Sequence, residues 1–272
     1  MHEIKIQCPA KINLTLKITG KRPDGFHNLE SIMQTISLYD YLNISVNPSE
    51  KSGILLSGNS NEIPYNEKNL VYKAAKLFLD EFKPDRNYEI DIYIDKNIPV
   101  AAGLAGGSTD AAGTLYGLNE LFEKPFSREE LHSLCAQLGS DLNFCLEGGA
   151  QLTTGRGEVL TRAEYKEHTV SLIKPINLGI SAKEAYTKFA RKHSFSDENR
   201  DKFINDLEWA IINDYPELQT IKNKYPLSVM SGSGSTYFIL GHTFEQMTDY
   251  WVMNNLKTTT KGVIAVEPQN LP

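Results

Sequence analysis

A glycine- and alanine-rich segment at residues 99–112, with the sequence PVAAGLAGGSTDAA, constrains the fold more than any other part of the chain. The run before it, residues 88–95, alternates polar and apolar side chains and predicts a β-strand. The alanine-rich stretch after it predicts a helix over about residues 107–122. A strand, a tight loop and a helix therefore follow one another, and this arrangement directs backbone N–H groups and a helix N-terminus toward an anion.

The small residues of this segment indicate which chemistry it supports. Gly103, Gly106 and Gly107 would let phosphate oxygens approach the backbone closely. Ser108 and Thr109 would add hydroxyl donors at the start of the helix. The segment therefore predicts a phosphate-binding loop. The same spacing also fits a plain glycine-rich turn, in which one of the two hydroxyl residues only caps the helix.

Three common nucleotide-binding patterns are absent from the sequence. It contains no G-x-x-x-x-G-K-[ST] run, which excludes a Walker-A loop. It contains no G-x-G-x-x-G run after a strand, which excludes the usual dinucleotide fingerprint. The H-R-D and D-F-G motifs of protein kinases are also missing.

Hydrophobic periodicity elsewhere predicts strands and helices without regular alternation, so the α+β class is favoured over a doubly wound sheet. Ser127 and Glu130 predict a capping box. Loop residues cluster between about 150 and 170, where we expect a boundary. The other expected strands lie at 3–19, 29–38, 41–47, 53–57, 170–173, 226–230, 236–240 and 262–266, and the other expected helices at 66–82, 127–138, 182–192, 202–213, 216–224 and 243–254.

Composition narrows the classes of partner and the compartment. The chain has 28 Lys and Arg against 34 Asp and Glu, a net charge of −6, which disfavours nucleic acid and anionic membranes as partners. Cys8, Cys135 and Cys145 are too few for a disulfide framework and are expected to be free thiols. The N-terminal residues lack a continuous apolar run. We therefore expect a cytoplasmic protein.

Five further motifs, together with residues 99–112, resemble the signatures of the GHMP kinases, the family of galactose, homoserine, mevalonate and phosphomevalonate kinases. The resemblance covers nearly the whole chain. It implies a two-domain α+β fold with the active site in the cleft between the domains, here an ATP-binding domain at 1–160 and a second domain at 161–272. The motifs are PAKINL at 9–14, RPDGFH at 22–27, LGSD at 138–141, GRGE at 155–158 and MSGSGST at 230–236.

The resemblance also implies an activity. The family transfers the γ-phosphoryl group of ATP, with Mg²⁺, to a hydroxyl group. The order and spacing of the motifs are most similar to those of the family branch that phosphorylates the 2-hydroxyl of a cytidine diphosphate-linked methylerythritol, in non-mevalonate isoprenoid synthesis. Asp141 matches the family's catalytic base, and Lys11 matches the lysine that stabilises the developing alkoxide. Neither the ligands of the metal nor the oligomeric state can be derived from the sequence.

The remaining site residues follow from the same alignment. Asn13 lies two residues after Lys11 and would share its face of the strand. Phe26 and His27 match the aromatic–His pair that holds the cytosine, and Tyr186 would supply a second aromatic face. Asn69 and Lys96 lie where the family approaches the adenine of ATP. With them, the expected ATP-binding residues are Pro99, Val100, Ala101, Ala102, Gly103, Leu104, Ala105, Gly106, Gly107, Ser108 and Thr109.

Alternatives remain for residues and for function. Taken alone, a lysine between strand hydrophobes is typical of a solvated face, an aspartate after Gly139-Ser140 is typical of a turn, and the aromatic residues fit ordinary packing. Asn143 stands where the family usually has proline, which would loosen the loop around Asp141. The chain could also phosphorylate another small alcohol, or be a silent relative that only binds.

Overall fold

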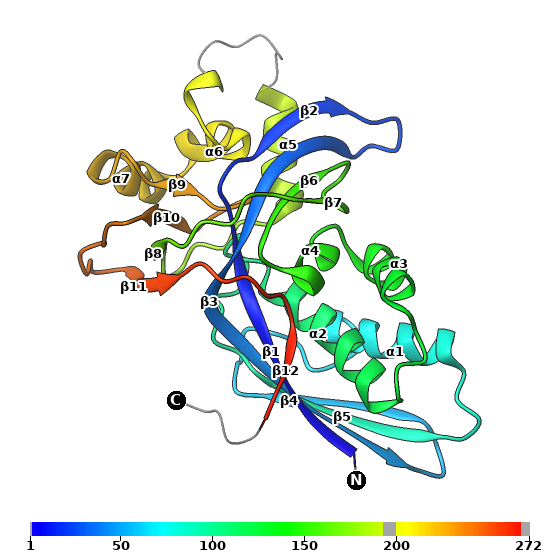
Figure 1. Cartoon of the computed structure of the whole chain (residues 1–272). Coiled ribbons are helices and arrows are strands. Elements are labelled where there is room, and N and C mark those ends of the chain that lie inside the picture. Colours follow the sequence, from blue (N-terminus) through cyan, green and yellow to red (C-terminus); the bar gives the residue numbers. More distant parts are fainter. Residues whose placement is uncertain (1, 193–199, 268–272) are drawn as a thin grey trace.

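The computed structural model describes residues 2–192 and 200–267, and within them two β-sheets carry the helices (Figure 1). The larger sheet has the strand order β12-β1-β3-β5-β4, with β2 and β6 paired to β3 and β7 paired to β6. Its strands are β1 (His2–Asn13), β2 (Lys17–Lys21), β3 (His27–Pro48), β4 (Gly53–Gly58), β5 (Tyr88–Asp95), β6 (Ala150–Thr154), β7 (Val159–Arg162) and β12 (Ile264–Val266).

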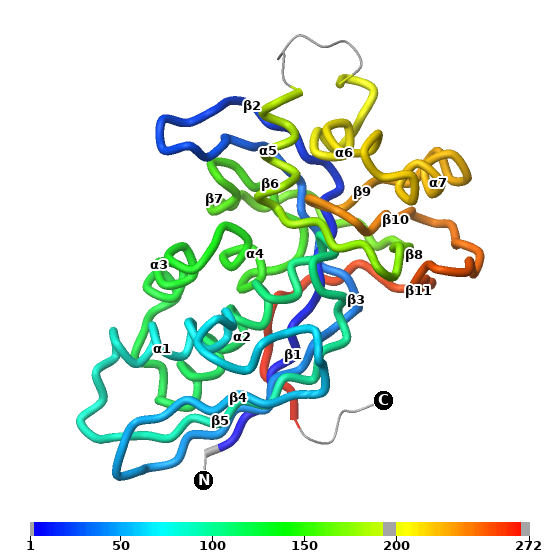
Figure 2. The backbone as a smooth tube through the Cα atoms, turned by 180° about the vertical axis from the view of Figure 1, so that it is seen from behind, coloured from blue at the N-terminus to red at the C-terminus, as the bar shows by residue number. Residues whose placement is uncertain are grey.

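Strand β3 connects the two ends of the molecule. Its 22 residues join the two strands expected at 29–38 and 41–47 into one. The first part of β3 pairs with β2 and β6, and the last part pairs with β1 and β5. In both ribbon views, the β4–β5 edge therefore lies at one end of β3 and β2 at the other (Figures 1 and 2).

Helix α2 (Gly106–Leu121) packs directly on β1 and β3, because two of its glycines face the sheet. A Cβ atom on Gly113 would lie 2.5 Å from Cys8 Sγ, and one on Gly117 would lie 2.7 Å from Ile44 Cδ1. This close approach fixes the N-terminus of α2 relative to β1. The neighbouring helices are α1 (Leu70–Phe82), α3 (Arg128–Leu138) and α4 (Leu142–Glu147), and α3 begins with the expected Ser127–Glu130 capping box.

The smaller sheet has the order β11-β8-β10-β9 and packs against a second group of helices. Leu16 and Ile18, from the segment around β2, enter this second core beside Phe189 and Trp209 and so join the two sheets. The elements are β8 (Thr169–Pro175), β9 (Val229–Met230), β10 (Tyr237–Leu240), β11 (Tyr250–Lys257), α5 (Ala182–Lys192), α6 (Asp206–Ile211), α7 (Pro216–Lys224) and the 3₁₀ turns Arg200–Lys202 and Ile212–Asp214.

The structure corrects several expectations. The helix expected at 243–254 is wrong, because Tyr250–Lys257 forms β11 and pairs antiparallel with β8. Helix α4 and strands β6 and β7 were not expected from the sequence. The boundary proposed between 160 and 161 lies inside β7, and β12 returns to the larger sheet, while the division into two domains stays a prediction.

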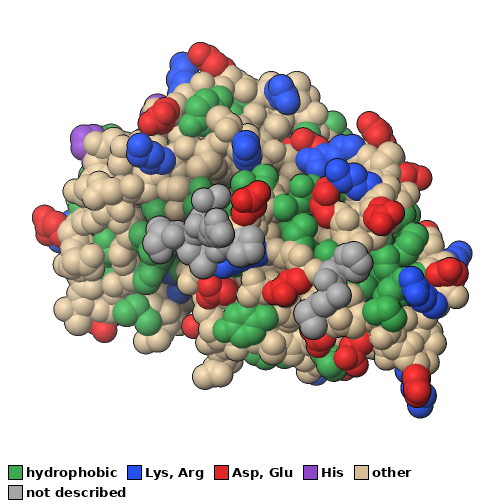
Figure 3. All heavy atoms as spheres, turned by 60° about the horizontal axis from the view of Figure 1, so that its bottom comes forward, with side chains coloured by type: hydrophobic (Ala, Val, Ile, Leu, Met, Phe, Trp, Pro, Cys, Tyr) green, Lys and Arg blue, Asp and Glu red, His purple; other side chains and the backbone are tan. Residues whose placement is uncertain are grey.

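The charged side chains on the surface and the lengths of the helices agree with the composition. On the face shown in Figure 3, acidic and basic side chains are interspersed. The longest helix of the described ranges, α2, has 16 residues, and none of the described helices combines the length and apolar character needed to cross a bilayer. Cys8, Cys135 and Cys145 are free and buried.

Candidate active site

A cavity of about 1070 Å³ lies between the phosphate loop, the β2–β3 turn and α5. This volume slightly exceeds the roughly 300–1,000 Å³ that is typical of a small-ligand pocket, so two substrates have room to meet there. All of the expected site residues line it except Leu104 and Thr109. Leu104 packs into an apolar core and Thr109 is fully buried, so neither side chain lines the cavity.

The phosphate loop is held in place by the segment that follows β9. Gly103 has a φ of +76°, and a Cβ on it would lie 2.1 Å from the Ser231 carbonyl oxygen, so only glycine fits here. The Ser231 hydroxyl donates a hydrogen bond to the Gly103 carbonyl at 2.9 Å. Gly106, Gly107 and Ser108 then open α2 toward the cavity. The N-terminal dipole and N–H groups of α2 therefore face the space where an anion would bind.

Lys11 and Asp141 meet at the same wall of the cavity. Lys11 Nζ lies 3.7 Å from Asp141 Oδ2 and donates to Asn13 Oδ1 at 2.6 Å and to the Gly103 carbonyl at 2.9 Å. Asn13 in turn donates to the Ser31 hydroxyl at 2.8 Å. The Lys11 side chain is 4 % exposed and Asp141 is 32 % exposed. A fixed ammonium group thus lies beside a carboxylate that solvent or substrate can reach.

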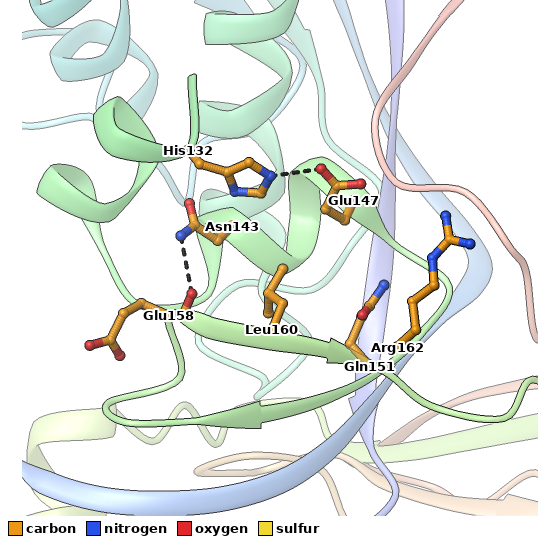
Figure 4. A pocket seen from close by; sticks show the side chains of 7 residues that line it. All are labelled: His132, Asn143, Glu147, Gln151, Glu158, Leu160 and Arg162. Atoms are coloured by element: carbon orange, nitrogen blue, oxygen red, sulfur yellow. Dashed lines mark hydrogen bonds and ion pairs between the residues drawn. The ribbon is translucent and has the colours of Figure 1, made fainter. Parts of the chain in front are cut away.

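Side-chain hydrogen bonds hold the segment around Asp141 in place, although it lacks the proline of the family pattern. Asn143 donates a side-chain hydrogen bond to the Glu158 carbonyl at 3.2 Å, which ties the start of α4 to the turn before β7 (Figure 4). At the other end of α4, a hydrogen bond from His132, together with Arg128, lowers the pKa of Glu147 to about 2 against the effect of burial. These contacts supply the rigidity that Asn143 was expected to remove.

Aromatic rings form the other end of the cavity. His27 and Tyr186 are stacked, with ring centroids 5.5 Å apart and an interplanar angle of 20°. Burial raises the pKa of Tyr186, so its hydroxyl stays neutral. Phe26 is 53 % exposed, and the Arg156 guanidinium lies 5.0 Å from its ring centroid. A flat, polar-edged ligand could contact these groups.

Two expected adenine contacts have other partners. The Asn69 side chain caps α1, accepting a hydrogen bond from Val71 N at 2.9 Å and donating to the Pro64 carbonyl at 2.6 Å. Lys96 donates to the Asp40 carboxylate and, at 3.1 Å, to the Ile98 carbonyl. Both residues line the cavity, and these hydrogen bonds hold their side chains in place.

Some lining residues were not found from the sequence. Arg156 was visible in the GRGE motif and carries a cation into the cavity, and this was the available signal. Ser181 precedes α5 in an ordinary polar turn, and Asp110 lies in an alanine-rich helix, so their place in the lining depends on the tertiary fold. Among residues 2–192 and 200–267, no group of three or more His, Cys, Asp and Glu side chains is placed to hold a metal ion.

The chain is similar in sequence to known kinases. Residues 69–149 match the model of the GHMP kinases N terminal domain. The 4-diphosphocytidyl-2-C-methyl-D-erythritol kinase of Clostridium botulinum (strain Kyoto / Type A2) is 40 % identical over 93 % of this chain and 96 % of its own. That of Syntrophomonas wolfei is 38 % identical over 85 % and 87 %.

Two solved structures of kinases superpose on this chain. A crystal structure of 4-(cytidine 5'-diphospho)-2C-methyl-D-erythritol kinase superposes with a TM-score of 0.71 at 26 % identity and covers 94 % of this chain and 100 % of its own. The homoserine kinase of Cytophaga hutchinsonii superposes with a TM-score of 0.70 at 14 % identity, covering 98 % of each chain, and so shares the fold.

Proposed function

The chain belongs to the GHMP kinase family, and from this premise we infer that it transfers the γ-phosphoryl group of ATP to 4-diphosphocytidyl-2-C-methyl-D-erythritol, a step of the non-mevalonate isoprenoid pathway. The acceptor atom in this proposal is the 2-hydroxyl. The observation that carries it is the approach of Lys11 and Asp141 to 3.7 Å in a cavity that has a phosphate loop at one end and aromatic rings at the other.

Asp141 is the proposed base. Its carboxylate takes the proton of the substrate hydroxyl as the oxygen bonds to the γ-phosphorus, and ADP leaves. Lys11 stabilises the negative charge that develops on the attacking oxygen. The hydrogen bonds from Lys11 to Asn13 and Gly103 hold its ammonium group in one position before the substrate arrives. The ammonium group therefore needs to move little when the reaction takes place.

The phosphates of ATP would lie at the N-terminus of α2. Magnesium in such sites is bound by a few protein oxygens together with substrate phosphates. The Ser108 hydroxyl at this end of the cavity fits that requirement and would hold the ion with the phosphates. When bound, Mg²⁺ neutralises charge that develops on the phosphate oxygens.

The aromatic end of the cavity suits the cytidine part of the substrate. His27 can hydrogen-bond the edge of the base, while Phe26 and Tyr186 offer ring faces. Arg156, beside Phe26, would balance the charge of the diphosphate that links the base to the acceptor. Mevalonate and homoserine have no ring for these groups to contact.

We expect strong selectivity among acceptors. In an assay of ADP release with ATP and Mg²⁺, kcat/KM for the cytidine-linked substrate should exceed that for mevalonate, homoserine or galactose by at least about 10²-fold, because only this substrate fills the aromatic end. Turnover confined to another alcohol would overturn the substrate and keep the kinase. ATP binding without turnover of any acceptor would favour a silent relative.

A change at the aromatic end should act on one substrate only. Replacing Tyr186 with Leu removes the ring that stacks on His27, so KM for the cytidine substrate should rise about threefold to tenfold. KM for ATP should stay the same, since the phosphate loop is untouched. Steady-state kinetics with Tyr186→Phe as the matched control check this, because Phe retains the ring. An equal rise in both KM values would assign Tyr186 to general packing.

A further inference from the structure

A buried ion cluster lies directly beneath the phosphate loop. Lys96 follows β5, Asp40 belongs to β3 and Asp110 to α2, and their side chains are 5 %, 0 % and 3 % exposed. Lys96 Nζ pairs with Asp40 and lies 3.6 Å from Asp110 Oδ2. Three segments that are far apart in the sequence therefore meet at one ammonium group.

Asp40 is the most completely bonded member of the cluster. Its Oδ2 accepts from Lys96, and its Oδ1 accepts from the backbone N–H groups of Asn97 and Ile98 at 2.5 and 2.8 Å. Asp40 thus fixes the segment that leads from β5 into the phosphate loop. A carboxylate with this many donors is a strong anchor for the backbone.

Lys96 Nζ donates hydrogen bonds to Asp40 and to the Ile98 carbonyl, and it lies within ion-pair distance of Asp110. Its position relative to the loop is equally restricted. A Cβ atom on Gly106 would lie 2.6 Å from Lys96 Nζ, so the ammonium group lies against the first residue of α2. Two carboxyl groups, one carbonyl and the start of α2 therefore surround the ammonium group at the base of the loop.

The cluster positions the backbone of the phosphate loop and does not supply net positive charge to the site. Asp110 Oδ1 is buried without a hydrogen-bond partner, and burial raises the pKa of Asp110 against the pull of Lys96. Because two carboxyl groups surround one ammonium group, the cluster has no net positive charge to attract a triphosphate. What the cluster fixes is the distance between the end of β5 and the N-terminus of α2.

We propose that Lys96, held by Asp40 and Asp110, is a positioning residue for the ATP phosphates: it sets the place of Gly106 and of the N-terminus of α2, and it makes no contact with adenine. The inference rests on the proposed use of this loop for ATP. It assigns the cluster to the phosphate end of the nucleotide.

A series of nucleotides separates the two roles. Dissociation constants of adenosine, ADP and a non-hydrolysable ATP analogue, measured by calorimetry with Mg²⁺, are compared for the wild type and Lys96→Met. We expect ADP and the ATP analogue to bind at least about tenfold more weakly, and adenosine to change by less than about twofold, because the hydrogen bonds from the N-terminus of α2 reach only the phosphates. Lys76→Met, on the exposed face of α1, is the matched control and should change none of the three.

Because Lys96→Met leaves buried carboxyl groups without their cation, it could unfold the protein. The double variant Lys96→Met with Asp40→Asn removes the ion pair as a unit and is measured in the same way, with thermal unfolding followed for each variant. A loss of adenosine affinity equal to that of ADP would overturn the proposal in favour of an adenine contact. Unchanged affinity for all three ligands would also overturn it.

The wild-type acceptor assay keeps this result separate from the proposed function. If the wild type binds ADP but turns over no acceptor, the proposed activity fails and the nucleotide series still decides the role of Lys96. If the wild type phosphorylates the cytidine substrate while Lys96→Met loses adenosine and ADP affinity equally, the activity stands and the positioning role is excluded.

Discussion

Replacing Asp141 with Asn is expected to lower kcat by about 10²–10⁴-fold, the range associated with loss of a general base. Asn keeps the size of the side chain and can still contact Lys11, but it cannot accept the proton of the substrate hydroxyl. KM for ATP should change little, because the change leaves the N-terminus of α2, where the phosphates are proposed to bind, unaltered. Steady-state ADP release with saturating substrates measures the effect.

The control for this variant is Asp80→Asn, the same chemical change at an exposed position on α1. It should leave kcat and the unfolding temperature unchanged within error. If Asp141→Asn retained more than about a tenth of wild-type kcat, proton transfer by this residue would contribute too little to make it the base. A matching loss in Asp80→Asn would point to a general effect of charge on the protein.

The parts of the fold that the sequence predicted well depend on local signals. The alternating run at 88–95 matches β5, and the segment at 216–224 matches α7, where Pro216 occupies the first turn. The Ser127–Glu130 capping box is confirmed because it needs only four consecutive residues. The period of two along β1 likewise placed Lys11 and Asn13 on one face, where they now share a hydrogen bond.

The failures involve partners that are distant in the sequence. Residues 243–254 have apolar side chains at helical spacing, but the aromatic and branched run that begins at Tyr250 pairs with β8, about 75 residues earlier, and the sheet overrides the local pattern. The pairing of Lys96 with Asp40 was not expected, because it depends on the register of β3 and β5, which the sequence does not show. Asn143 compensates for the missing proline through a hydrogen bond to the turn between β6 and β7, two strands that were themselves not expected.

Replacing Lys11 with Met should have the second large effect on catalysis. Loss of one group that stabilises charge in the transition state lowers kcat by about 10²–10³-fold. The change also leaves Asn13 Oδ1 without its donor, while the Gly103 carbonyl keeps the Ser231 hydroxyl, and this should lower the free energy of unfolding by about 1–3 kcal/mol. The kinetic measurement is therefore made well below the unfolding temperature of the variant, which is determined separately.

Lys11→Arg tests whether a positive charge alone is sufficient. The ammonium group is enclosed, since a Cβ on Gly232 would lie 3.0 Å from Nζ, and a larger guanidinium cannot occupy the same position beside Asp141. We therefore expect Arg to recover less than about a tenth of the activity lost in Lys11→Met, because the stabilisation depends on the position of the donor. Full recovery of activity by Lys11→Arg would show that a positive charge near this position is enough. A near-wild-type kcat in Lys11→Met would remove Lys11 from the mechanism and leave Asp141 to act with the phosphate loop alone.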